Sequence, residues 1–170
     1  MSTNSPGGPV LSLLVPIYNV ERYLRECLDS AVAQTLEDIE IICINDGSTD
    51  NSPAIIREYM ERDARVKMID KANSGYGDSM NRGLEMARGK YVGILESDDF
   101  MAPDALEKLV VAAERNGADF AKANFDFYWS KPEERRSLHE MFRPKDCGKP
   151  VHPSDTTQFF KQKPSIWSAV

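Results

Sequence analysis

Three carboxylates stand together in the stretch "ESDDF", where Glu96, Asp98 and Asp99 follow the apolar run 91–95. Two like charges 4 Å apart repel by about 4 kcal/mol at an effective dielectric near 20, so such a cluster needs either water or a cation. One carboxylate could cap a helix starting near Ala102, but a cap does not need the other two. We therefore favour a functional role for this turn. Carboxylates of this kind bind Mg²⁺ or Mn²⁺, and the ion in turn holds phosphates.

Alternating strands and helices are expected to position this turn. Apolar and β-branched runs predict buried strands, and apolar residues at helical spacing predict a helix after each of the first four. The expected strands are 11–15, 39–44, 66–69, 91–95 and 119–124. This alternation of strands and helices indicates βαβ units, and hence an α/β fold with a mostly parallel sheet and helices on both faces.

Proline, serine and glycine mark the expected ends of these elements. Pro16 should stop the first strand, because a proline has no amide hydrogen to donate to a sheet. Ser52 should cap the second helix, with Pro53 at its first position. Gly89 and Gly117 should end the third and fourth helices. These residues therefore predict where the connecting loops begin.

Polar or glycine-rich turns follow each of the first four predicted strands. In open α/β sheets, ligands bind beyond the carboxyl ends of the strands, so four such turns at one edge favour a binding site. Taken singly, Asp46-Gly47 is a good turn sequence that needs no ligand, and Asn73 with Gly75 could simply lead into a helix. The polar residues of these turns are Tyr18, Asn19, Asn45, Asp46, Asp50, Asn73 and the three carboxylates of "ESDDF".

Several classes of site are excluded by their missing motifs. Neither the dinucleotide-binding pattern G-x-G-x-x-G nor the P-loop pattern G-x-x-x-x-G-K-[ST] occurs. The two histidines, His139 and His152, lie in an irregular region away from any nucleophile. The net charge of −6, without a basic stripe, argues against nucleic-acid binding. The residues alone thus indicate a metal-assisted site for a nucleotide or a sugar phosphate.

The cysteines and the hydropathy bear on where the protein works. Cys27 and Cys43 fall on apolar faces, so we expect reduced core residues in a cytoplasmic protein. No run of residues is long enough to span a bilayer. Peripheral association with the inner face of the membrane is left open.

Three blocks of this sequence, in this order, resemble the GT-A-fold glycosyltransferases of family 2. They are "LLVPIYNVERYLRECLDSAVAQT", "IEIICINDGSTDNS" and "ARGKYVGILESDDF", and the resemblance covers roughly residues 10–125. It implies a Rossmann-like nucleotide-diphospho-sugar transferase fold and transfer of a sugar from a nucleotide-diphosphate donor, often UDP. It also implies a saccharide or lipid-linked acceptor, Mn²⁺ or Mg²⁺ as cofactor, inversion at the anomeric carbon, and a role in surface-polysaccharide synthesis.

The resemblance also implies a set of site residues. Asp98 and Asp99 match the carboxylates that meet the ribose and the metal, and Asp99 is our first choice for the direct ligand. Asn45 and Glu96 depart from the family, which usually has Asp at both positions, and this puts the reach of Glu96 to the metal in doubt. The residues expected to bind the nucleotide sugar are Pro16, Tyr18, Glu21, Asp46, Asn73, Gly75, Asn81 and Asp98.

The same resemblance suggests a division of the chain. Residues 1–9 are expected to form a disordered tail, 10–129 the nucleotide-sugar-binding domain, and 130–170 an irregular acceptor-side segment. Because the chain stops in the apolar stretch "PSIWSAV", we expect a truncated C-terminal part. No motif identifies the catalytic base, for which Asp126, Asp146 and Asp155 are unsupported candidates.

Two rival hypotheses follow from these gaps. The chain could be a nucleotide-sugar-binding domain that is catalytically incomplete by itself. A nucleotidyltransferase on a similar sheet ranks low, because the first loop lacks the glycines and basic residues that hold a triphosphate.

Overall fold

The computed structural model describes residues 8–123, 125–126 and 138–139. Its larger sheet is wholly parallel, with the strands in the order β3-β2-β1-β4. The strands are β1 (Leu11–Ile17), β2 (Ile39–Asp46), β3 (Val66–Lys71) and β4 (Tyr91–Ile94). The helices are α1 (Glu21–Val32), α2 (Ser52–Arg62), α3 (Tyr76–Met86) and α4 (Ala105–Asn116).

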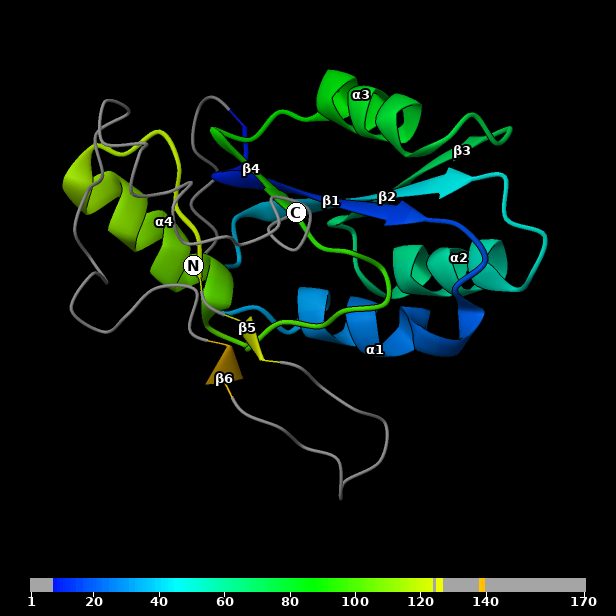
Figure 1. Cartoon of the computed structure of the whole chain (residues 1–170), viewed down its shortest axis with the longest axis horizontal. Coiled ribbons are helices and arrows are strands. Elements are labelled where there is room, and N and C mark those ends of the chain that lie inside the picture. The colour runs from blue at the N-terminus through cyan, green and yellow to red at the C-terminus, as the bar shows by residue number, and fades with distance from the viewer. Residues whose placement is uncertain (1–7, 124, 127–137, 140–170) are drawn as a thin grey trace. The chain divides into compact units, whose positions relative to one another are not determined.

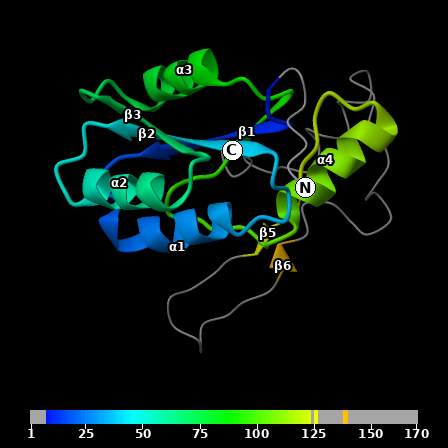
Figure 2. The ribbon, with the colours of Figure 1, turned by 180° about the vertical axis from the view of Figure 1, so that it is seen from behind.

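Helices cover both faces of this sheet, which confirms the predicted α/β fold. Figure 1 shows α3 on one face and α1 with α2 on the other, and Figure 2 shows the same layers from behind. Under α3, the fully buried Leu14, Ile42 and Ile44 pack against Met80 and Met86. The chain divides into two units within α4, one ending at Glu107 and one beginning at Lys108. The residues of the binding site described below belong to the first unit, whereas the candidate base Asp126 belongs to the second.

The prediction that Pro16 stops the first strand is wrong, because β1 continues to Ile17. The carbonyl of Leu14 accepts the amide of Leu95, so the backbone hydrogen-bonding groups of Leu14 face β4. The backbone nitrogen of Pro16, two residues further, faces the same side of β1. However, the pairing of β1 with β4 ends at Leu14 and Ile94. The missing amide hydrogen of Pro16 therefore costs no bond, while the pairing with β2 continues to Ile17 and Asn45.

The predicted strand at 119–124 is also wrong for the residues that the structure describes, 119–123. A short antiparallel pair forms later instead, between β5 (Phe125–Asp126) and β6 (Leu138–His139). Residues 119–123 contain two alanines and no β-branched residue, and alanine is a poor strand former. The prediction for Gly117 is confirmed: it has a φ of 57° and follows the last residue of α4.

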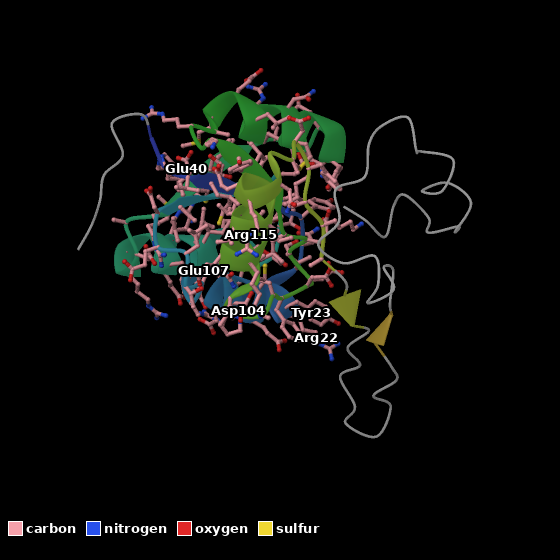
Figure 3. The ribbon with its side chains drawn as sticks, turned by 90° about the vertical axis from the view of Figure 1, so that its left-hand side faces the viewer. Arg22, Tyr23, Glu40, Asp104, Glu107 and Arg115 are labelled. Atoms are coloured by element: carbon pink, nitrogen blue, oxygen red, sulfur yellow. The ribbon has the colours of Figure 1, made fainter. Side chains whose placement is uncertain are left out.

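A buried carboxylate joins three segments at the amino end of the sheet. The Glu40 carboxylate accepts hydrogen bonds from Ser12 Oγ at 2.6 Å, Lys67 Nζ at 2.6 Å and the Arg88 amide at 2.7 Å. Figure 3 labels Glu40 at this end. Burial alone would raise the pKa of Glu40, but these bonds outweigh it and hold the pKa below its ordinary value. Glu40 therefore connects β1 and β3 to the loop that leads into β4.

Gly89 does not end α3, contrary to prediction, because the helix stops at Met86. Its amide donates instead to Ser12 Oγ at 2.8 Å, and a Cβ at this position would lie 2.4 Å from the backbone nitrogen of Ser12. Glycine is thus required by the close approach of two backbones. Sequence alone does not show this approach, since it joins residues 77 positions apart.

We expect Gly89→Ala to lower the free energy of unfolding by about 2–3 kcal/mol. The new Cβ would clash with the backbone of Ser12, which cannot move away as a flexible side chain can. Urea denaturation measures this loss. Gly77→Ala is the matched control, since a Cβ there meets nothing within 4 Å, and its helical position should gain up to about 1 kcal/mol. Equal stability of the two variants would contradict the close approach at Gly89.

Candidate functional site

The turns that follow β1 and β2 are joined by hydrogen bonds at the carboxyl edge of the sheet. The Asn19 side-chain oxygen accepts the Thr49 amide at 2.8 Å, and the Asn19 amide donates to Ser48 Oγ at 3.0 Å. Asn19 has a φ of 53°, a conformation that asparagine tolerates better than most residues. Next to it, Tyr18 is 51% exposed, while Pro16 is buried inside β1. Tyr18 is therefore available to a ligand at this edge.

Glu21 belongs to the same set of contacts. Its carboxylate accepts the Asn51 amide at 2.8 Å, and its own amide donates to the Asp50 carboxylate at 2.9 Å. Asp50 also accepts the Ser52 amide at 2.9 Å. Ser52 does not cap its own helix as predicted, because its hydroxyl is buried and accepts the Val20 amide at 3.2 Å. Glu21 therefore has a structural partner, and its contact with a nucleotide stays a prediction.

Asp46 fixes the loop between β3 and α3. Its buried carboxylate accepts the amides of Ser74 at 2.8 Å and Gly75 at 2.9 Å, together with Lys71 Nζ. Burial alone would raise the pKa of Asp46, but Lys71 and the two amides outweigh it and lower the pKa. A carboxylate has about four acceptor positions, and these three donors leave about one of them open.

Two glycines bring this loop close to the end of β2. Gly47 has a φ of 69°, and a Cβ there would lie 2.6 Å from the backbone nitrogen of Asn73. Gly75 has a φ of 90° and directly precedes α3. Asn73 and Gly75 therefore lie beside Asp46, as expected. Asn81, also expected to bind the nucleotide sugar, lies exposed within α3, which begins at Tyr76.

The "ESDDF" turn is the third part of the site. The Asp99 amide donates to the Glu96 carbonyl at 3.0 Å, which turns the chain after β4 and leaves Asp98 and Asp99 exposed. The half-buried Glu96 carboxylate accepts a hydrogen bond from Tyr76 Oη at 2.7 Å. Burial and the charge of Asp98 raise the pKa of Asp99. Burial and the charges of Asp98 and Asp99 likewise raise the pKa of Glu96, against the effect of the tyrosine.

This donor set fits a divalent cation held together with a diphosphate. Asp98 and Asp99 repel each other and would gain from a positive ion. No group of three or more acidic, histidine or cysteine side chains able to hold a metal occurs in the part of the chain that is described. Mg²⁺ commonly takes only one or two protein carboxylates and completes its shell with phosphate and water oxygens. Two carboxylates therefore suffice for such a site.

The structure also shows where Asn45 lies and which of the three candidate bases belong to the described residues. Asn45 is buried, and its amide donates to Asp70 at 2.7 Å while its oxygen accepts the Ser48 amide at 3.1 Å. It therefore shapes the turn. Asp126 lies in β5, and Asp146 and Asp155 lie outside the described residues.

Sequence reasoning missed Lys71 and Tyr76. Lys71 contacts Asp46, Ser74 and Asp78, and its side chain is only 11% exposed. A lysine at the end of a strand gives no signal of such contacts by itself. Tyr76 directly follows Gly75 in the sequence, and its bond to Glu96 depends on the fold.

The model of the family "Glycosyl transferase family 2" matches residues 12–167. The chain belongs to this family. Family 2 membership confirms the resemblance seen in the sequence, and the GT-A fold of the similar solved structures agrees with the sheet described above.

This chain is similar to a curated relative and to two solved structures over part of their lengths. The glycosyltransferase EpsJ of Bacillus subtilis (strain 168) is 40% identical over 129 residues, which are 76% of this chain and 37% of EpsJ. TarS 1-349 of S. aureus in complex with UDP-GlcNAc has a TM-score of 0.59 at 29% identity, covering 63% of this chain and 32% of TarS 1-349. The mannosyltransferase PcManGT from Pyrobaculum calidifontis, in complex with GDP-Man and Mn²⁺, has a TM-score of 0.55 at 26% identity, covering 61% and 32%.

This chain thus spans little more than a third of EpsJ. Within the described residues, no helix is both long enough and apolar enough to cross a membrane.

Proposed function

We propose that this chain binds a nucleotide-diphosphate sugar, most simply a UDP-sugar, at the carboxyl edge of its sheet. The protein would transfer that sugar to a saccharide or lipid-linked acceptor. One observation carries the proposal: the loop held by Asp46 and the turn with Asp98 and Asp99 meet at this edge in a family 2 chain, joined by Tyr76 and Glu96. That TarS was solved with UDP-GlcNAc and PcManGT with GDP-Man supports a nucleotide-sugar donor.

In this proposal the nucleoside lies over the ends of β1 and β2. The exposed Tyr18 ring would lie against the base, and the open acceptor position of Asp46 would take a base amide. Pro16 is buried, so its contribution would come through the backbone. The loop with Asn73 and Gly75 would line the nucleotide, and Asp98 would bind the ribose.

Asp99, with Asp98, would hold a Mn²⁺ or Mg²⁺ ion. When bound, the ion would stabilise the negative charge of the departing diphosphate. The carboxylates would orient the donor for a direct displacement that inverts the anomeric carbon. A base elsewhere in the protein would take the proton of the acceptor hydroxyl.

We also propose that the protein works in the cytoplasm, with peripheral association to the inner face of the membrane where the acceptor is lipid-linked. The free, buried thiols of Cys27 and Cys43 agree with a reducing compartment.

The test is calorimetric titration of the 170-residue chain with UDP and with GDP, each with and without MnCl₂. We expect UDP to bind, more tightly with Mn²⁺ than without it. Absence of binding would overturn the proposal, and a preference for GDP would overturn the choice of UDP. Transfer is measured on the same 170-residue chain with UDP-sugars and Mn²⁺, and binding without transfer would favour the binding-domain hypothesis.

Asp46→Ala should weaken UDP binding about ten-fold both with and without Mn²⁺, because it frees the loop that contains Asn73 and Gly75. Asp46→Asn keeps one acceptor oxygen for the loop amides and should lose less. Calorimetry of both variants against UDP checks this order. An affinity unaltered in Asp46→Ala would rule out a role of Asp46 in nucleotide binding.

A further inference from the structure

Tyr76 and Glu96 form a hydrogen bond between two segments of the proposed site. Tyr76 Oη donates to Glu96 Oε1 at 2.7 Å. Tyr76 is the first residue of α3, and Glu96 lies two positions after the last residue of β4. Gly75, directly before Tyr76, is bound to Asp46 at the end of β2, and β1 lies between β2 and β4, so the bond links segments on the two sides of β1. We call this contact the Tyr76–Glu96 bridge.

Both partners of the bridge are held by their own surroundings. Gly75, directly before Tyr76, is bound to Asp46 through its amide at 2.9 Å, and the Ser79 amide donates to the Gly75 carbonyl at 3.1 Å. On the other side, the Glu96 carbonyl accepts the Asp99 amide at 3.0 Å and lies 3.7 Å from the buried Cys27 Sγ. The bridge therefore joins two ordered segments, one next to Asp46 and one next to Asp99.

The length of the glutamate side chain fits this contact. A glutamate carries its carboxylate one methylene further from the backbone than an aspartate does. Shortening it would withdraw the carboxylate by about one C–C bond from a tyrosine that is anchored at its own backbone. A hydrogen bond weakens steeply over such a change in distance. The bond to Tyr76 thus gives position 96 a reason to be Glu that does not involve a metal.

From this geometry we propose that Tyr76 is a positioning residue, and that Glu96 serves as its acceptor and not as a metal ligand. The bridge sets the spacing between the loop that lines the nucleotide and the turn that carries Asp98 and Asp99. This inference rests on the proposed function of the same site. It adds to that function the residue pair that aligns the nucleotide-binding and metal-binding parts.

Two substitutions of Glu96 give opposite results under the two possible roles. Glu96→Gln keeps an acceptor oxygen at the same reach but loses the charge, so the bridge predicts a Mn²⁺-dependent UDP affinity within about two-fold of wild type. Glu96→Asp keeps the charge but shortens the side chain, so the bridge predicts a loss of about five-fold. A metal-ligand role predicts the reverse order, and that order would overturn the proposal.

Tyr76→Phe tests the other partner. It should lower the UDP affinity about five-fold with Mn²⁺ but much less without it, because only the metal-bound state needs both segments aligned. Tyr23→Phe is the matched control, because this α1 tyrosine is 38% exposed and its ring lies 5.2 Å from the Arg22 guanidinium, a contact that phenylalanine retains. Figure 3 labels both Tyr23 and Arg22. Equal affinities of the two variants would contradict the positioning role.

Hydrogen exchange without nucleotide separates this inference from the proposed function. In Tyr76→Phe, the Ser74 and Gly75 amides should exchange at least about five-fold faster than in wild type. If wild type fails to bind UDP, the proposed function fails, and the exchange rates still decide whether the bridge orders the loop. Unchanged exchange of these two amides would overturn the bridge.

Discussion

Replacing Asp99 with alanine should remove the Mn²⁺-dependent part of the UDP affinity, a loss of at least about 100-fold. The reason is the small number of ligands at the "ESDDF" turn. An ion held by two carboxylates and a diphosphate has, among the described residues, no further cluster of ligands to replace a lost carboxylate. Calorimetric titration of UDP at fixed Mn²⁺ measures the change.

The same substitution should leave the metal-free protein at least as stable as wild type. Burial and the charge of Asp98 raise the pKa of Asp99, so alanine removes both a desolvation cost and a repulsion. A lower melting temperature without Mn²⁺ would mean that Asp99 has a structural role instead. Asp38→Asn is a suitable control for loss of one negative charge, since residue 38 precedes β2 at the opposite edge of the sheet. Mn²⁺-dependent affinity that survives in Asp99→Ala would refute the metal assignment.

Replacing Glu40 with alanine should lower the free energy of unfolding by about 3 kcal/mol. Its side chain is 4% exposed, and its removal leaves Ser12, the Arg88 amide and Lys67 without their shared acceptor. Because the Lys67 side chain is 37% exposed, water can solvate its ammonium and limit the loss. Glu61→Ala, at an exposed position of α2, should change stability by no more than about 0.5 kcal/mol.

Glu40 should also give stability a dependence on pH. Its folded-state pKa lies below the ordinary value of 4.5, so its contribution is complete above pH 4.5. That contribution is lost as the pH falls from 4.5 through the lower folded-state pKa. Urea midpoints measured between pH 7 and pH 3 should therefore fall less steeply in Glu40→Gln than in wild type. Parallel curves for the two proteins would contradict the lowered pKa.

The two central strands, β1 and β2, were predictable because each is an apolar run, and burial on both faces requires such runs. The outer strands β3 and β4 are only partly buried, and shorter apolar runs predicted them. The end of the first strand was not predictable. Whether Pro16 breaks a strand depends on the neighbour that its nitrogen faces, and this is set by the pairing with β4. The prediction that Ser52 caps its own helix was wrong for a similar reason, since its hydroxyl accepts the amide of Val20, which is 32 positions away.

The acidic residues of the candidate site stand out from residue types alone, whereas their hydrogen bonds could not be predicted. Asp46, Asp98 and Asp99 stand out because three carboxylates follow predicted strands. Lys71 does not stand out, because its partner Asp46 lies 25 positions away and only the pairing of β2 with β3 brings them together. Tyr76 and Glu96 are 20 positions apart and meet only once α3 crosses the sheet.

The contacts of Asp50 and Glu21 have a consequence for how the chain folds. Asp50 binds the first amide of α1, Glu21 binds the Asn51 amide just before α2, and Ser52 in α2 binds the Val20 amide just before α1. Each helix start is thus stabilised by residues of the other βα unit. Helix nucleation is costly, so neither helix has its full start until both strands are paired. The first two βα units should therefore form in one cooperative step, in which the long-range pairing of β1 with β2 limits the folding rate.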